Sequence, residues 1–250
     1  LGGKFFAPKK ISRRCCVFGA NVFTGPIKIT HAMGSQGWGK HHYGKFSFQE
    51  TNGTVYSCRA GFLDSGHFRQ AADLTAYISV LLKQGFNKGK RFELRLDRTS
   101  IELKVPQLID KPSFEDRIRI AQRITFELLT WHEIVSWYTH PPFAPINHQV
   151  STFSIEDSYS NLWGTYLGAR ALKLMQKKEE LNFAQAVDQT LIQMLIEVKA
   201  VKSSKNTTQA FKNIDGLWWN SSKRYPSNYM TPMRYIPYTN TVKPWLIENV

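Results

Sequence analysis

The chain has 250 residues, of which 42% are hydrophobic, 13% aromatic and 21% charged, and its formal net charge is +14. This composition excludes an intrinsically disordered chain, because such chains combine low hydrophobicity with high charge. No apolar run approaches the roughly 18 residues that a membrane-spanning helix needs, which excludes a transmembrane protein. The sequence therefore predicts a folded globular protein.

The positive charge is concentrated at the two ends. Residues 1–50 hold eight Lys or Arg against Glu50, and residues 201–250 hold seven against Asp215 and Glu248, so these ends carry +12 of the +14. Such ends could meet an anionic ligand or a membrane surface. We favour a solubilising basic surface, and the absence of any nucleic-acid motif argues against sequence-specific nucleic-acid binding.

The first 62 residues read as short strands and loops. Candidate strands are Cys15–Phe18, Ile27–His31 and Val55–Phe62. Cys15 or Cys16 could form a disulfide with Cys58 in an oxidising compartment, because adjacent cysteines do not easily pair with each other. Further along, alternating apolar and charged residues at 91–105 predict a β-hairpin with one buried face.

Four helices have clear boundaries. Asp64 can cap a helix from Ser65 to Lys83 that Gly85 ends, and Arg69 and Asp73 within it are spaced for an ion pair. The other three begin at capping pairs: Ser113 with Asp116 before a helix to Tyr138, Ser154 with Asp157 before Ile155 to Met175, and Asn182 with Gln185 before a helix to about Lys199.

The segment 211–250 is rich in aromatics and interrupted by prolines, which predicts an irregular arm packed on the helices. The predicted fold is therefore α+β and mainly α, with about four core helices, a small antiparallel sheet and an aromatic C-terminal arm. We expect a single domain over 1–250, in which 1–62 supply strands and loops, 63–200 the helices and the hairpin, and 211–250 the arm.

The segment Thr130–Tyr138 contains His132 followed by Glu133. It begins like the His-Glu-x-x-His helix of zinc peptidases, but Ser136 stands where the second histidine would be. His132 falls in an apolar stripe with Leu128 and Val135, which predicts that its ring faces the interior. A buried histidine beside a carboxylate suits a metal or acid–base site, and it equally suits a structural hydrogen-bond network.

Two other helices carry polar residues on their apolar faces. His67 lies in the first turn of the helix that Asp64 caps. Asp157 and Asn161 lie one turn apart on another helix, although Asp157 also reads as a member of a capping box. Polar groups on the inward sides of three helices predict a shared buried site.

Three blocks of the chain carry a family resemblance: Cys58–Asp64 with Gly66–Arg69, Trp131–Tyr138, and Phe153–Asp157 with Tyr159–Gly164. They resemble a bacterial envelope or secreted domain that is catalogued only as a domain of unknown function. The resemblance covers about residues 55–175 and implies a bacterial source and a secreted or periplasmic location. It supplies no reaction. The first residue is Leu1 rather than Met, which suggests that an N-terminal segment has been removed.

The leading hypothesis is a metal-assisted hydrolase in which His67, His132 and Asp157 bind zinc or another divalent metal and Glu133 is the general base. A second hypothesis is a non-catalytic secreted protein that binds an anionic glycan, lipid headgroup or nucleic acid through its basic, aromatic ends. A third makes Cys58 a thiol nucleophile with His67 or His132 as its base.

Overall fold

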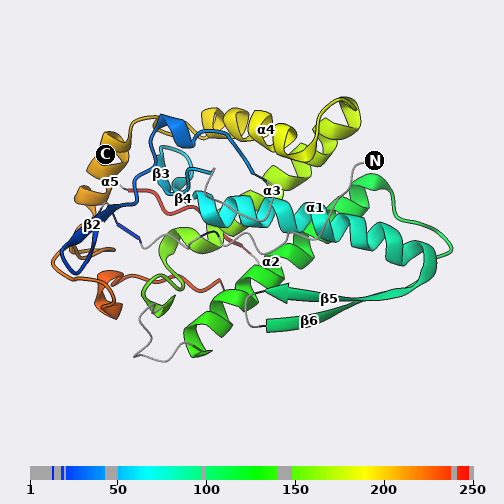
Figure 1. Cartoon of the computed structure of the whole chain (residues 1–250), viewed down its shortest axis with the longest axis horizontal. Helices are drawn as coiled ribbons and strands as arrows, with labels where there is room; N and C mark the ends of the chain where they lie inside the picture. Colours follow the sequence, from blue (N-terminus) through cyan, green and yellow to red (C-terminus); the bar gives the residue numbers. More distant parts are fainter. Residues whose placement is uncertain are drawn as a thin grey trace.

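The computed structural model describes residues 13, 18–19, 21–42, 50–96, 99–139, 148–237 and 241–247. Within them lie five α-helices and three two-stranded antiparallel sheets (Figure 1). In chain order the elements are β1 (Asn21–Thr24), β2 (Ile27–Thr30), β3 (Thr54–Ser57), β4 (Gly61–Asp64), α1 (Ser65–Lys88), β5 (Lys90–Leu96), β6 (Thr99–Val105), α2 (Phe114–Thr139), α3 (Ile155–Lys177), α4 (Phe183–Glu197) and α5 (Ser204–Asn213). The predicted mainly helical α+β class is confirmed.

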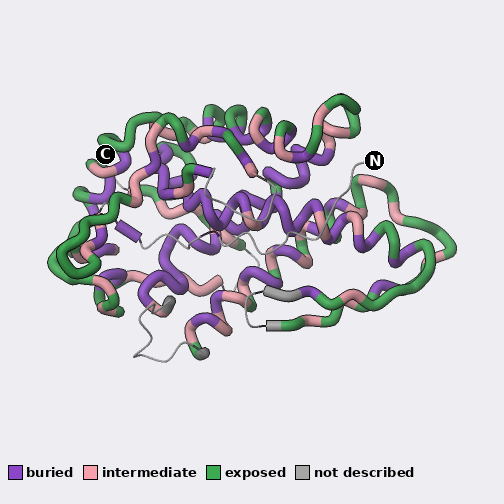
Figure 2. The backbone as a smooth tube through the Cα atoms, in the orientation of Figure 1, coloured by how far each residue is buried: buried purple, intermediate pink, exposed green. Residues whose placement is uncertain are grey.

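Helices α1 and α3 form the centre of the molecule. Helix α2 packs against both of them and α4 packs against α3, so that the most deeply buried backbone is where α1 and α3 meet (Figures 1 and 2). Two glycines of α3 make this contact close: a Cβ at Gly164 would lie 2.4 Å from the Phe68 carbonyl oxygen, and one at Gly168 would lie 2.6 Å from that of Ala72. Larger residues would hold the helices apart.

Each predicted helix start is confirmed by its capping contacts. The Asp64 side chain accepts hydrogen bonds from the backbone N–H groups of Gly66 and His67, and Ser113 accepts one from Asp116 N–H. Reciprocal capping boxes open α3 at Ser154 and α4 at Asn182. Short polar side chains that satisfy orphan N–H groups thus define where these helices begin.

The C-terminal end of α1 differs from the prediction. The helix continues through Gly85 to Lys88 and ends at Gly89, which has a φ of +60°. Gly85 serves another purpose, because a Cβ there would lie 2.3 Å from the Val105 side chain. This glycine lets the predicted hairpin of β5 and β6 pack directly on α1.

The predicted strand Val55–Phe62 is in fact two strands. It folds back on itself as β3 and β4, and Tyr56 pairs with Phe62 across the sheet. Gly61 has a φ of +65°, which L residues rarely adopt and which allows the tight turn. Cys58 lies exposed and unbridged in that turn, while Cys15 and Cys16 lie outside the described residues.

The predicted irregular arm of 211–250 begins later than expected, because residues 211–213 belong to α5 (Ser204–Asn213), and aromatics of the C-terminal part pack against the N-terminal part of the chain. Phe18 meets Phe211 edge to face at 5.0 Å, and Phe62 stacks on Phe211 at 4.6 Å between ring centroids. Phe211 belongs to α5, a helix that the sequence patterns did not predict. The two ends of the chain therefore share one hydrophobic core.

Candidate functional site

His67 lies at the centre of a buried polar cluster between α1 and α3. Its side chain is 8% exposed. Nδ1 lies 3.1 Å from the Asn161 side-chain oxygen, and Nε2 lies 3.1 Å from Oδ1 of Asp157. The expectation that Asp157 and Asn161 share an inward face is therefore confirmed, since one imidazole ring contacts both.

Asp157 is fully buried and its two oxygens have different surroundings. Oδ2 accepts the Ser154 backbone N–H at 3.0 Å, which is the capping box of α3. Oδ1 accepts no hydrogen bond of normal geometry from the described residues, and it faces His67 Nε2. Burial raises the pKa of Asp157 well above its ordinary value, His67 opposes that rise, and Glu133 and Asp64 add to it.

Glu133 enters the same cluster from α2. It is 4% exposed, and its Oε2 accepts the backbone N–H of Phe153 at 3.3 Å. One ligand atom each from His67, Glu133 and Asp157 lie within 4.8 Å of one another, so among the described residues these three side chains could hold a metal ion together.

Glu156 is a further buried carboxylate, 1% exposed, whose Oε2 has no hydrogen-bond partner in the described part of the chain. Its Oε1 lies 3.1 Å from the Ser154 hydroxyl, which also lies 2.8 Å from the Ser151 carbonyl and 3.0 Å from Asp157 Oδ2. One hydroxyl proton cannot serve three acceptors. Burial, with Asp157 and Asp64 nearby, raises the pKa of Glu156 well above its ordinary value.

Arg234 brings a positive charge near these acids, but its hydrogen bonds go elsewhere. Its guanidinium donates to the backbone carbonyls of Thr152, Val150 and Asn228 and lies 5.2 Å from the centre of the Trp137 ring. Burial lowers the pKa of Arg234, and the charges of Asp157 and Glu156 partly restore it. The sequence patterns gave no sign of this residue.

The structure thus brings together three of the four residues singled out from the sequence. His67, Asp157 and Glu133 meet, whereas His132 is half-buried and is not part of the group. The buried ridge of α2 passes through Leu129, Glu133 and Ser136, which corrects the prediction that the His132 side of the helix faces inward. The catalytic and ligand roles of all four residues stay predictions.

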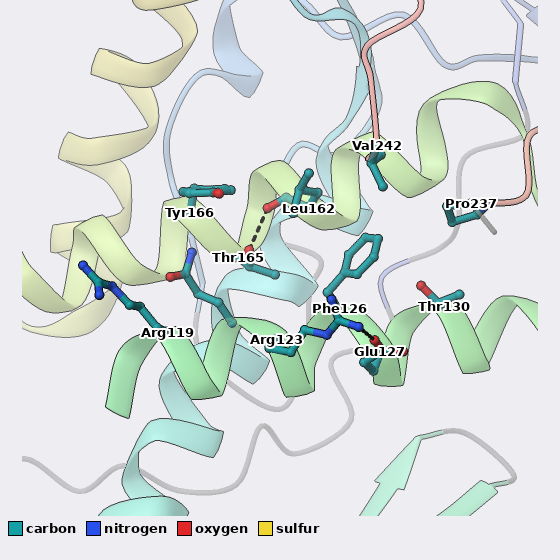
Figure 3. A pocket seen from close by; sticks show the side chains of 11 residues that line it. Arg119, Arg123, Phe126, Glu127, Thr130, Leu162, Thr165, Tyr166, Pro237 and Val242 are labelled. Carbon is teal, nitrogen blue, oxygen red and sulfur yellow. Dashed lines mark hydrogen bonds and ion pairs between the residues drawn. The ribbon is translucent and has the colours of Figure 1, made fainter. Parts of the chain in front are cut away.

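A groove of about 520 Å³ lies between α2 and α3, which also carry residues of the cluster (Figure 3). Phe126 and Thr130 line it from α2, Leu162 and Tyr166 from α3, and Pro237 borders it from the C-terminal segment. On α2, Thr130 precedes Glu133 by three residues, or about 4.5 Å of helix rise, and Leu162 directly follows Asn161. The groove and the cluster therefore occupy consecutive turns of the same two helices.

A second buried cluster of charges lies between α1 and the N-terminal part of the chain. Arg13 makes two hydrogen bonds to Glu50, at 2.8 and 2.9 Å, and one to Asp73 at 2.7 Å, and His41 Nε2 also lies 2.7 Å from Asp73. Arg69 donates to three backbone carbonyls and lies 3.7 Å from Glu50. The predicted pair of Arg69 with Asp73 is therefore wrong, because Arg13 and His41 take that carboxylate.

Fold and cluster together define an α+β protein with a buried histidine and carboxylate site. Comparison with known families then places the chain: residues 4–247 match the family described as "Protein of unknown function (DUF4056)", and the chain belongs to that family. The expected membership of a family of unknown function is confirmed. No curated protein and no solved structure matches the chain. None of the helices among the described residues is long and apolar enough to cross a bilayer.

Proposed function

We propose that the protein binds a divalent metal ion through His67, Glu133 and Asp157 and uses it as the Lewis acid of a hydrolase. The observation that carries the proposal is the pair of contacts made by the His67 ring. The Asn161 side-chain oxygen lies at Nδ1, so in a neutral ring Nδ1 donates its proton to that oxygen and Nε2 carries the lone pair. That lone pair then faces a carboxylate oxygen at 3.1 Å.

Two lone pairs at this distance repel each other unless a proton or a metal cation lies between them. In a tetrahedral zinc site with bonds of about 2.0–2.1 Å, neighbouring ligand atoms are about 3.3 Å apart. The separation of Nε2 and Oδ1 is close to that value. A histidine that binds metal with one nitrogen and donates from the other to an oxygen acceptor is the usual arrangement at such sites.

The charge balance supports a cation as well. Glu133, Glu156 and Asp157 are each at most 4% exposed, and the hydrogen bonds of Arg234 go to backbone carbonyls. Buried carboxylates need a paired cation or a proton. One divalent ion supplies two charges at the point where His67 and Asp157 meet.

The ligand set suits zinc or another first-row divalent metal, because imidazole and carboxylate ligands together fit such ions. Three protein ligands would leave a position for water or substrate, which is the arrangement of catalytic zinc sites. The groove lies on the same two helices, α2 and α3, that carry Glu133 and Asp157. In this proposal Glu133 is a ligand, in place of the general base expected from the sequence.

The deep burial of the cluster favours a second candidate, in which the metal is structural and joins α1, α2 and α3. Metal binding is common to both candidates, and turnover separates them. The groove favours the hydrolase, since a purely structural site has no need of a recess between the same helices.

Metal content of protein purified without a histidine tag tests the site. We expect about one equivalent of zinc after dialysis against zinc, and a rise in unfolding free energy of about 2.7 kcal/mol at a hundred times the dissociation constant. Asp157→Asn keeps an oxygen for the capping box but removes the charge, so it should lose the zinc without losing the fold. His132→Ala is the matched control and should keep the zinc.

The proposal fails if the protein takes up no zinc, manganese or iron and Asp157→Asn is as stable as the unaltered protein. That result would show that the cluster holds a proton in place of a metal. Hydrolysis is tested separately with p-nitrophenyl acetate and p-nitrophenyl phosphate. If the zinc-loaded protein hydrolyses either ester and Glu133→Gln abolishes that hydrolysis, the hydrolase candidate is supported. Zinc uptake without turnover of either ester would support the structural candidate.

A further inference from the structure

Both carboxylates of the candidate metal site are held by one short backbone segment, residues 150–154, which leads directly into α3. The Phe153 N–H donates to Oε2 of Glu133 at 3.3 Å. The Ser154 N–H donates to Oδ2 of Asp157 at 3.0 Å. The two acids belong to different helices, α2 and α3, so these adjacent N–H groups fix the position of one carboxylate relative to the other.

This segment needs support from the rest of the chain. Residues 151–153 form a turn, and Phe153 has a φ of +58°, which lies in the left-handed region that L residues rarely adopt. A residue other than glycine stays in that region only where its surroundings hold it there. Contacts from outside the segment must therefore keep the two N–H groups in place.

Arg234, in the C-terminal segment, supplies contacts of this kind. Its guanidinium donates to the carbonyls of Val150 and Thr152 through a different nitrogen for each. The N–H of the next residue, Tyr235, donates to the Phe153 carbonyl at 2.8 Å. Two adjacent residues of the C-terminal segment thus bind three carbonyls of the 150–154 segment.

Arg234 also contacts the helix that carries Glu133. Its guanidinium lies 5.2 Å from the centre of the Trp137 ring, and Trp137 follows Glu133 by about one turn of α2. Among the described residues, the hydrogen bonds of Arg234 end at backbone carbonyls. Arg234 therefore acts on the two carboxylates through the backbone segment and not by direct contact.

We infer, on the basis of the proposed function, that Arg234 is a positioning residue of the metal site: by holding the 150–154 segment it orients Glu133 and Asp157. The sign of its effect on zinc separates this role from simple electrostatics. Arg234 places a positive charge near Asp157, and that charge opposes the binding of a cation. Removal of the charge alone would strengthen zinc binding, whereas loss of positioning weakens it.

The zinc affinity of two Arg234 variants tests this role by titration against a competing chelator. We expect Arg234→Ala to raise the dissociation constant for zinc at least about tenfold. Arg234→Lys should bind zinc almost as weakly, because one ammonium nitrogen keeps the charge but does not reproduce the fork that binds two carbonyls. Millimolar guanidinium chloride should restore the affinity of Arg234→Ala, and sodium chloride at the same concentration should not.

Two control variants separate positioning from a general loss of stability. Phe86→Ala removes a buried ring that lies about 28 Å of helix rise from His67 along α1. It should lower the Tm and leave the dissociation constant for zinc unchanged. Arg224→Ala removes another arginine of the C-terminal segment, one that lies over the Phe23 ring, and should bind zinc like the unaltered protein.

Amide hydrogen exchange of the metal-free protein gives a second measurement that needs no zinc. Arg234→Ala should speed exchange of the Phe153 and Ser154 N–H groups at least about tenfold, and Arg224→Ala should leave it unchanged. If the unaltered protein took up no zinc, the proposed function would fail, and this exchange would still decide whether Arg234 holds the two N–H groups.

Three results would overturn the inference itself: zinc binding by Arg234→Ala that equals or exceeds that of the unaltered protein, full zinc affinity in Arg234→Lys, or equal exchange of the two N–H groups in Arg234→Ala and Arg224→Ala.

Discussion

Replacing Gly164 by alanine should separate the two helices that form the candidate site. The new Cβ would lie 2.4 Å from the Phe68 carbonyl oxygen and 2.6 Å from the Ala71 Cβ, whereas ordinary contacts are at least 3.4 Å. The helices must therefore part by roughly 1 Å, since the atoms in the way belong to the backbone and to a Cβ. Overpacking of this kind costs up to about 3 kcal/mol.

The gain in helix propensity from glycine to alanine offsets about 1 kcal/mol of that cost, which leaves a net loss of about 2 kcal/mol. For a chain of this size the loss corresponds to a fall in Tm of roughly 4–8 °C. Gly34→Ala is the control, because its Cβ would come no nearer than 3.9 Å to any atom and its φ is −93°. That variant should unfold within about 2 °C of the unaltered protein.

The same variant should weaken zinc binding. His67 directly precedes Phe68, so a shift of α1 lengthens the 3.1 Å contacts of the imidazole with Asn161 and Asp157. We expect the dissociation constant for zinc, measured by titration against a competing chelator, to rise at least about tenfold. If Gly164→Ala matched Gly34→Ala in both Tm and zinc affinity, the close contact of α1 and α3 would not be what holds the site.

Three further changes probe the rest of the structure. Burial alone would raise the pKa of Glu50, but Arg13 lowers it to about 2. The ionised Glu50 therefore stabilises the fold above its ordinary pKa of 4.5, and the protein should lose up to about 3 kcal/mol of unfolding free energy as the pH falls from 4.5 to 2. Urea unfolding of Glu50→Gln should show a flatter pH dependence over that range, and a slope equal to that of the unaltered protein would contradict this. Asp64→Ala should cost about 1 kcal/mol through loss of the α1 cap, measured by urea unfolding, while Asp64→Asn should recover most of it. Phe211→Ala should lower the unfolding free energy by about 3–5 kcal/mol, because it removes a fully buried ring from the core shared by both ends, and a loss under about 1 kcal/mol would show that this core collapses around the gap.

The sequence predicted best those features that depend on neighbouring residues. Capping pairs such as Ser154 with Asp157 satisfy backbone groups within one turn, so they mark helix starts whatever the rest of the chain does. The hairpin of β5 and β6 likewise depends on local alternation. Features that depend on distant contacts were not predicted. The sequence suggests that Gly85 ends the helix, whereas in the fold its lack of a side chain leaves space for Val105.

The candidate site shows the same limit. His67, Glu133 and Asp157 could be named from the sequence because they are polar residues on amphipathic helices. The sequence could not decide which of two adjacent residues on α2 points inward. An apolar stripe through Leu128 and Val135 places His132 on the inner face. A stripe through Leu129 and Ser136 places Glu133 there. The packing of α2 against α1 and α3 settles the phase in favour of Glu133. Arg234 could not be found because it reaches the site from an irregular segment.

The two buried charged clusters differ in a way that bears on function. Around Glu50 and Asp73, the guanidinium of Arg13 contacts both carboxylates and Arg69 and His41 lie alongside, so acids and cations are matched by the chain itself. Around Asp157, by contrast, Asp157 Oδ1 and Glu156 Oε2 receive no hydrogen bond from the described residues. Burying unmatched carboxylates is costly for folding. A cluster whose charges are matched internally serves the fold, whereas buried carboxylates without such partners must take up either protons or a metal cation, which is why the His67 cluster is the site to test with metal.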